Sequence, residues 1–156
     1  GNSGGKGGKG ANSFYGLGSG GKGQALFYEG GNGGDTETGF NTIGGSGGGG
    51  GGGGTPGTGG NGGNGGGFII LQSKNIYINS GAYLKADGTN GTVVTVGGGG
   101  GGGGLILLSY SKTISIAGTL SVKGGTGGVS AYGSAQNGTD GKKQSLNLST
   151  GVLTDL

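Results

Sequence analysis

Two stretches of the chain share one pattern of apolar and polar positions, and each of them follows a run of glycines. Residues 67–88 are GFIILQSKNIYINSGAYLKADG, and residues 104–125 are GLILLSYSKTISIAGTLSVKGG. They align with a 37- to 38-residue period, in which Gly67 matches Gly104 and Ile76 matches Ile114. In both, a four-residue aliphatic block leads to a lysine, an alternating stretch, a turn glycine and a second alternating stretch. The pattern predicts a repeated unit of short β-strands.

The two kinds of apolar pattern predict different degrees of burial. The aliphatic blocks 68–71 and 105–108 show no alternation, so we expect these strands to be covered on both faces. The other stretches alternate with a period of two, which predicts strands with one wet face. Their apolar members are Ile76, Ile78, Leu84 and Ala86 in the first copy and Ile114, Ile116, Leu120 and Val122 in the second, with turns at Gly81 and Gly118.

The ends of the chain depart from this repeat. Residues 145–156, SLNLSTGVLTDL, form a degenerate third copy with no glycine tract before it, which predicts a cap. Near the start, Phe14, Phe27 and Phe40 recur at equal intervals, and this 13-residue period predicts smaller stacked units with one aromatic anchor each. We therefore divide the chain into an aromatic-anchored glycine region (1–43), a polyglycine tract (44–67) and a strand-rich region (68–156).

Glycine dominates the composition and changes what the strands can build. The chain has 54 Gly and 1 Pro in 156 residues, with 28% hydrophobic residues. Such a composition is typical of disorder, but the apolar residues gather in blocks, which favours a thin core. Helix is excluded, because each interior glycine costs about 1 kcal/mol relative to alanine.

The octaglycine run 97–104 is either a slack tether or an ordered element. A second run of eight at 47–54 and the near-pure glycine stretch 59–67 supply partners for it. Glycine in polyproline-II geometry permits close backbone approach and interchain hydrogen bonds. We expect ordered tracts, and hence an all-β fold without helix, in which short strands form a β-solenoid or sandwich-like stack combined with polyglycine-II tracts.

Glycine tracts that run into LILLSY and FIILQS, with INSG and IAGT turns, resemble glycine-rich surface and virion proteins, notably the adhesins at the tips of phage tail fibres. The resemblance covers residues 44–128 and implies a sandwich of polyglycine-II strands with receptor-binding loops at one end. The polyglycine-II bundles of springtail antifreeze proteins are also similar. Those proteins use cystines and a Gly-x-x period, and neither is expected in this chain.

Charge and residue types exclude most chemistry. The chain carries 9 Lys and 6 acidic residues, a net charge of +3, and it lacks Cys and His. The lysines are scattered, so no nucleic-acid footprint is expected. No nucleophile–base pair, cofactor fingerprint or metal cluster is present, and the acidic cluster of Glu29, Asp35 and Glu37 is expected to be a wet loop. The pairs Asp87-Gly88 and Asp140-Gly141 are interpreted as turn signals.

We therefore expect a non-enzymatic structural or adhesive module, extracellular, on a cell surface or in a virion, that is a subunit of a fibre or filament. Its expected partners are copies of itself and a cell-surface glycan or outer-membrane receptor, with no cofactor, nucleic acid or membrane insertion. The chain opens on Gly1, as a mature product or fragment would. The alternative is the receptor-binding tip adhesin of a tail fibre, for which the loop 130–143 offers Tyr132, Gln136, Asn137, Asp140 and Lys142.

A further alternative is an ice-binding protein. It would require a flat, regularly spaced array of threonines, and we expect no common spacing among the threonines of this chain.

Overall fold

The computed structural model describes residues 60–93, 97–131 and 133–156, which contain eight strands and no helix. The predicted all-β class is therefore confirmed for this part of the chain. The 13-residue aromatic repeat and the boundaries drawn within residues 1–59 lie outside it and stay predictions.

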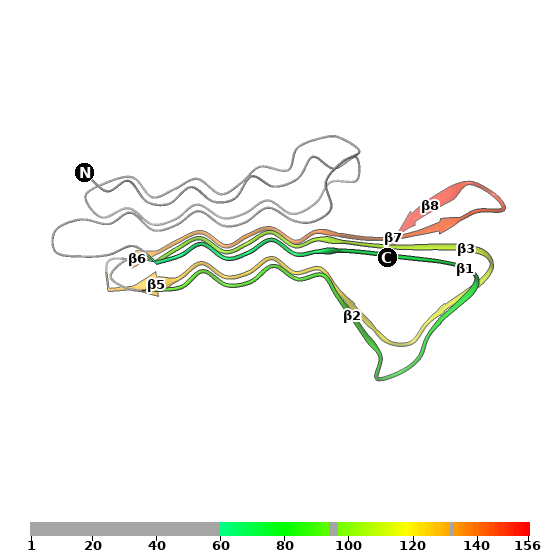
Figure 1. Cartoon of the computed structure of the whole chain (residues 1–156), viewed down its shortest axis with the longest axis horizontal. Coiled ribbons are helices and arrows are strands. Elements are labelled where there is room, and N and C mark those ends of the chain that lie inside the picture. The colour runs from blue at the N-terminus through cyan, green and yellow to red at the C-terminus, as the bar shows by residue number, and fades with distance from the viewer. Residues whose placement is uncertain (1–59, 94–96, 132) are drawn as a thin grey trace.

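The strands form three sheets (Figure 1). The largest has the order β1-β3-β7-β8, in which β1, β3 and β7 are parallel and β8 is antiparallel to β7. A second sheet pairs β2 with β4 in parallel, and a third is the β5–β6 hairpin. The bounds are β1 Phe68–Ile78, β2 Tyr83–Lys85, β3 Leu105–Ile116, β4 Thr119–Ser121, β5 Val129–Ser130, β6 Gly133–Ser134, β7 Lys142–Asn147 and β8 Val152–Asp155.

The strand register confirms the repeat. Phe68 pairs with Leu105 and Ile76 pairs with Ile114, which are the partners that the alignment of the two copies predicts. The interval between partners grows by one at an irregularity between Ser73 and Asn75, where the register of β1 on β3 shifts. A parallel sheet thus aligns equivalent positions of successive copies.

Two details of the predicted unit are wrong. The aliphatic block 68–71 and the alternating stretch at Ile76 are not separate strands, because both belong to β1. The third copy begins earlier than residue 145, since Leu105 pairs with Lys142. It ends as the β7–β8 hairpin, so its last strand returns to the same sheet instead of joining β2 and β4.

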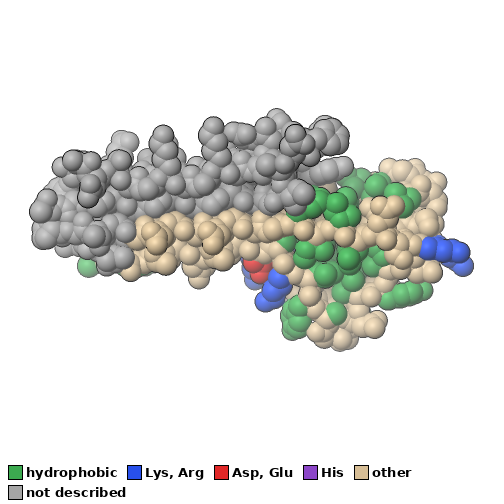
Figure 2. Space-filling view, in the orientation of Figure 1, with side chains coloured by type: hydrophobic (Ala, Val, Ile, Leu, Met, Phe, Trp, Pro, Cys, Tyr) green, Lys and Arg blue, Asp and Glu red, His purple; other side chains and the backbone are tan. Residues whose placement is uncertain are grey.

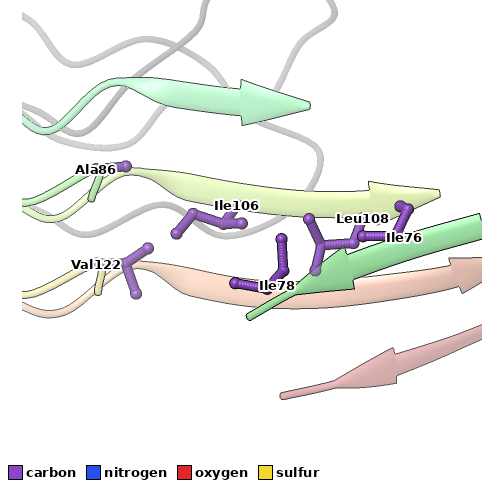
Figure 3. Close-up of a cluster of buried hydrophobic side chains, with 6 residues drawn as sticks. All are labelled: Ile76, Ile78, Ala86, Ile106, Leu108 and Val122. Atoms are coloured by element: carbon purple, nitrogen blue, oxygen red, sulfur yellow. The ribbon is translucent and has the colours of Figure 1, made fainter. Parts of the chain in front are cut away.

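The core is thin and lies between the β1-β3-β7-β8 sheet and the β2-β4 sheet (Figure 3). Its buried members come from β1, β3 and the residues that follow β2 and β4, namely Ile76, Ile78, Ala86, Ile106, Leu108 and Val122. All four side chains of 105–108 are buried, as predicted for that block. The equivalent expectation for 68–71 is wrong, because Ile70 is 50% exposed.

Five glycine-rich segments continue the strands in straight lines (Figure 1). The first (60–67), third (97–104) and fifth (135–141) glycine segments lead directly into β1, β3 and β7. The second (86–92) and fourth (122–128) glycine segments leave β2 and β4 and run in the opposite direction. One row of three segments therefore lies against a row of two.

The third glycine segment is an ordered part of the fold and lies at the centre of the bundle. Its backbone donates at every third residue to the second glycine segment, from Gly98, Gly101 and Gly104. It also exchanges hydrogen bonds with the other three segments, through Gly66 N to Gly102 O at 2.7 Å, Gly125 N to Gly101 O at 2.7 Å and Gly103 N to Thr139 O at 2.8 Å. The tether interpretation of residues 97–104 is therefore wrong.

A Gly-x-x period does occur, against expectation. Glycines recur at every third position in the second segment (Gly88, Gly91), the fourth (Gly125, Gly128) and the fifth (Gly138, Gly141). At five of these positions a Cβ would lie within 2.3 Å of a backbone oxygen of a neighbouring segment, and at Gly128 it would lie 2.7 Å from the side chain of Val93. The period marks the side of each segment that faces the bundle interior.

The absence of side chains in the third glycine segment is a steric requirement. A Cβ on Gly101 would lie 1.9 Å from the backbone oxygen of Asn64, and one on Gly104 would lie 1.7 Å from that of Gly67. Real carbon and oxygen atoms cannot approach so closely, so a side chain here would separate the segments and break their hydrogen bonds.

We expect Gly101→Ala to lower the free energy of unfolding by about 1–3 kcal/mol or more, because backbone atoms must move to admit the methyl group. Gly67→Ala is the matched control, since a Cβ there meets nothing within 4 Å and Gly67 has no positive φ. It should be neutral or stabilising by about 0.4–1 kcal/mol, through the smaller entropy of the unfolded chain. Denaturant unfolding measures both, and equal effects would contradict the close approach.

Candidate functional site

The polar side chains of the glycine segments form the most regular constellation among the described residues. In the second segment the sequence is Asp-Gly-Thr-Asn-Gly-Thr over residues 87–92, two Asx-Gly-Thr triplets in succession. Because the backbone hydrogen bonds also recur every three residues, each triplet presents the same groups to the same neighbours. Each three-residue repeat therefore makes both side-chain and backbone hydrogen bonds to the neighbouring segments.

The Asx-Gly part of each triplet makes two hydrogen bonds to the backbone of one residue in the fourth segment. Asp87 Oδ1 accepts a hydrogen bond from Lys123 N at 2.7 Å, and Gly88 N donates to Lys123 O at 2.8 Å. Asn90 and Gly91 hold the N–H and C=O of Thr126 in the same way, at 2.8 and 2.9 Å. One side chain and one backbone amide therefore satisfy both polar groups of a single partner residue.

The threonine of each triplet makes hydrogen bonds to the backbone of one residue in the first segment. Thr89 N donates to Asn64 O at 2.9 Å, and Thr89 Oγ1 accepts from Asn64 N at 2.7 Å. Thr92 makes the equivalent pair of bonds with the N–H and C=O of Asn61. The second segment therefore ties the first segment to the fourth.

The fifth segment completes the hydrogen bonding of the fourth. Asn137 Oδ1 accepts from Gly127 N and Asp140 Oδ1 accepts from Gly124 N, each at 2.8 Å. Together with the bonds above, every backbone N–H from 123 to 128 then has an acceptor: two are oxygens of the third segment and four are Asx side chains, Asp87, Asn90, Asn137 and Asp140. Where no glycine segment supplies a carbonyl, a side chain replaces it.

The structure places the predicted contact residues on this framework. Tyr132 lies outside the described residues. Asn137 and Asp140 hold the fourth segment, Gln136 O accepts from Gly100 N, and Lys142 begins β7 with an exposed side chain. The interpretation of 130–143 as one loop is wrong, because β6, the fifth glycine segment and β7 occupy residues 133–143. Whether these residues contact a receptor stays a prediction.

Two chain reversals lie at the end of the bundle remote from β2 and β4 (Figure 1). One follows the second segment, where Val93 bridges to Gly97, and the other is the β5–β6 hairpin. The side chain of Val93 reaches the backbone of Gly128, and Val93 and Val129 are 44% and 69% exposed. Two apolar side chains therefore face solvent at this end.

The described part of the chain contains no group of three or more His, Cys, Asp or Glu residues that could hold a metal ion. No helix in this part has the length and apolar character needed to cross a bilayer. The acidic cluster of Glu29, Asp35 and Glu37 lies outside the described residues.

Sequence reasoning missed the triplets, although they are visible as DGTNGT. The interpretation of Asp87-Gly88 and Asp140-Gly141 as turns is wrong, since both pairs lie within straight segments. Thr89 and Thr92 lie three residues apart, one in each triplet. A search for Asx-Gly at a three-residue period would have found the pattern.

Comparison of the chain with models of known protein families, with curated proteins and with solved structures gave no match.

We expect Asn137→Ala to lower the free energy of unfolding by about 1–3 kcal/mol, because it leaves the buried N–H of Gly127 without an acceptor. Asn137→Asp is the matched control. It keeps the accepting oxygen, and Asp140 already fills the equivalent role three residues on, so its effect should be much smaller. Similar losses in both variants, measured by thermal or denaturant unfolding, would refute the capping role.

Proposed function

We propose that the chain is a non-enzymatic structural and adhesive module, outside the cell or in a virion, that serves as a subunit of a fibre or filament. The observation that carries the proposal is the continuity of the glycine segments with the strands. Each segment passes directly into or out of a β-strand and is hydrogen-bonded to its neighbours at every third residue. Such a body resists bending, because bending would break many aligned hydrogen bonds at once.

The finer architecture that we propose is a sandwich of polyglycine-II helices. Three residues per turn is the period of that helix, and it matches the step of the hydrogen bonds. At about 3.1 Å per residue, the eight glycines of the third segment would span about 25 Å. The successive copies of the repeat would then be the coils of a short β-solenoid that continues this sandwich.

Exposed strand edges support assembly with further copies of the chain. Among the described strands, β1 and β8 form the two edges of the largest sheet. All four residues of β8 are exposed, with Val152 at 56% and Leu153 at 44%. Its one charged residue, Asp155, accepts a hydrogen bond from Gln144 Nε2 at 2.9 Å. An edge with exposed apolar side chains and a single charge is open to pairing with another strand.

The register of β8 indicates how two copies would pair. Leu156 N donates to Lys143 O, so the alternation of an antiparallel ladder turns the backbone groups of Thr154 toward β7 and those of Leu153 and Asp155 outward. Two β8 strands related by a twofold axis at Thr154 can therefore exchange hydrogen bonds between Leu153 and Asp155. This register also sets Val152 opposite Leu156 of the partner copy.

We expect Leu153→Pro to abolish this contact while β8 stays on β7, because it removes a donor that faces outward. Leu153→Thr keeps the donor and should assemble, more weakly. Light scattering at micromolar concentration measures the mass, and circular dichroism checks that the fold is intact. An unchanged mass in Leu153→Pro would refute the β8 contact, whereas a wild-type monomer would count against the assembly itself.

A second candidate function is receptor binding at the end formed by the β5–β6 hairpin and the turn after the second segment. The exposed Val93 and Val129 favour it, because exposed apolar side chains are typical of recognition surfaces. A cell-surface glycan or an outer-membrane receptor is the expected partner. Ice binding is less favoured, since the hydroxyls of Thr89 and Thr92 already accept backbone hydrogen bonds.

We expect Val129→Lys to reduce attachment to receptor-bearing cells several-fold without lowering the unfolding temperature, because the side chain is exposed and the hairpin backbone is unchanged. Lys123→Ala, also exposed but at the other end of the fourth segment, next to β4, is the control for general surface changes. Equal attachment of all three proteins would exclude this end as the binding surface.

A further inference from the structure

Four Asn-Gly pairs lie in the described residues, and each is a potential site of spontaneous covalent change. They are Asn61-Gly62, Asn64-Gly65, Asn90-Gly91 and Asn137-Gly138. In such a pair the backbone nitrogen of the glycine can attack Cγ of the asparagine. A new N–C bond closes a succinimide ring, the C–N bond of the side-chain amide breaks, and ammonia leaves. Water then opens the ring to give aspartate or isoaspartate.

The two pairs at Asn90 and Asn137 are held at both reacting groups. Gly91 N donates to Thr126 O and Gly138 N donates to Gly125 O, each at 2.9 Å. The side-chain oxygen of each asparagine accepts a backbone N–H at 2.8 Å, from Thr126 or Gly127. The nitrogen cannot reach Cγ until the glycine amide and the asparagine oxygen have both left the neighbouring segment.

The two pairs in the first segment are held differently. The backbone N–H and C=O of Asn61 and Asn64 are bound by Thr92 and Thr89, but their side chains are exposed and make no hydrogen bond within the described structure. The amides of Gly62 and Gly65 likewise have no acceptor among the described residues. Among the described residues, nothing therefore holds either of the two groups that must react.

We propose that Asn61 and Asn64 are sites of spontaneous deamidation in the folded protein, and that the bundle protects Asn90 and Asn137. The inference does not depend on the proposed function. Conversion of Asn61 and Asn64 would add two negative charges and lower the formal net charge from +3 to +1. An isoaspartate would also lengthen the backbone by one carbon and disturb the three-residue register that aligns Gly63 with Gly99.

The reaction can be followed in the full-length chain. The protein is incubated at mildly alkaline pH, folded or unfolded in urea, and each asparagine is scored by peptide mass spectrometry for replacement of its amide by a carboxyl group. In the folded chain Asn61 and Asn64 should react at least about tenfold faster than Asn90 and Asn137, whose reaction requires two hydrogen bonds to open. In urea all four should react at similar rates.

A pair of variants provides the control. Asn61→Gln with Asn64→Gln should remove most of the deamidation observed in the described part of the folded chain, because glutamine would have to close a larger ring. Equal rates at the four sites in the folded protein, or faster reaction at Asn90 or Asn137, would overturn the proposal. Circular dichroism before and after incubation confirms that folded protein was tested.

Discussion

Backbone-to-backbone contact between glycine segments is the constraint on which the rest of the structure depends. Segments that approach closely enough for a Cβ on Gly101 to fall 1.9 Å from a neighbouring oxygen can have no side chain on that side. In return, each segment can contact several others at once, and the third segment bonds to four. A β-strand in a sheet has two hydrogen-bonded neighbours, so this arrangement extends hydrogen bonding from a layer to a bundle.

The same constraint explains why the molecule changes character along its length. Where side chains return, as at Leu105, the backbones must separate into two sheets and a core fills the space between them. The hydrophobic residues accordingly gather over the end that holds β1 to β4, as the face in Figure 2 shows, while the glycine segments expose backbone and polar groups. Because each glycine segment is continuous with a strand, the same stretch of chain takes part in both the glycine bundle and a β-sheet.

The sequence was informative where side chains make the structure. The pairing of equivalent positions in successive copies, the burial of 105–108 and the turn at Gly81, which has a φ of 83°, followed from apolar alternation and glycine placement. The sequence was misleading in the glycine segments, where backbone hydrogen bonds instead of side-chain packing determine the structure. Asp87-Gly88 has the composition of a turn, but its partner Lys123 lies far along the chain, so no local pattern reveals that the pair belongs to a straight segment.

The side chains that remain in the bundle complete it at its surface. A peripheral segment lacks neighbours on its outer side, and unpaired N–H groups there would destabilise the fold. For the fourth segment, the missing acceptors come from its two neighbours: Asp87 and Asn90 of the second segment, and Asn137 and Asp140 of the fifth. A short side chain with a terminal oxygen suits this role, because it reaches one neighbour and leaves the glycine beside it free to pack. Stability in this half of the molecule therefore rests on hydrogen bonds in a fixed three-residue register, and a chain with 28% hydrophobic residues can be ordered without a wide core.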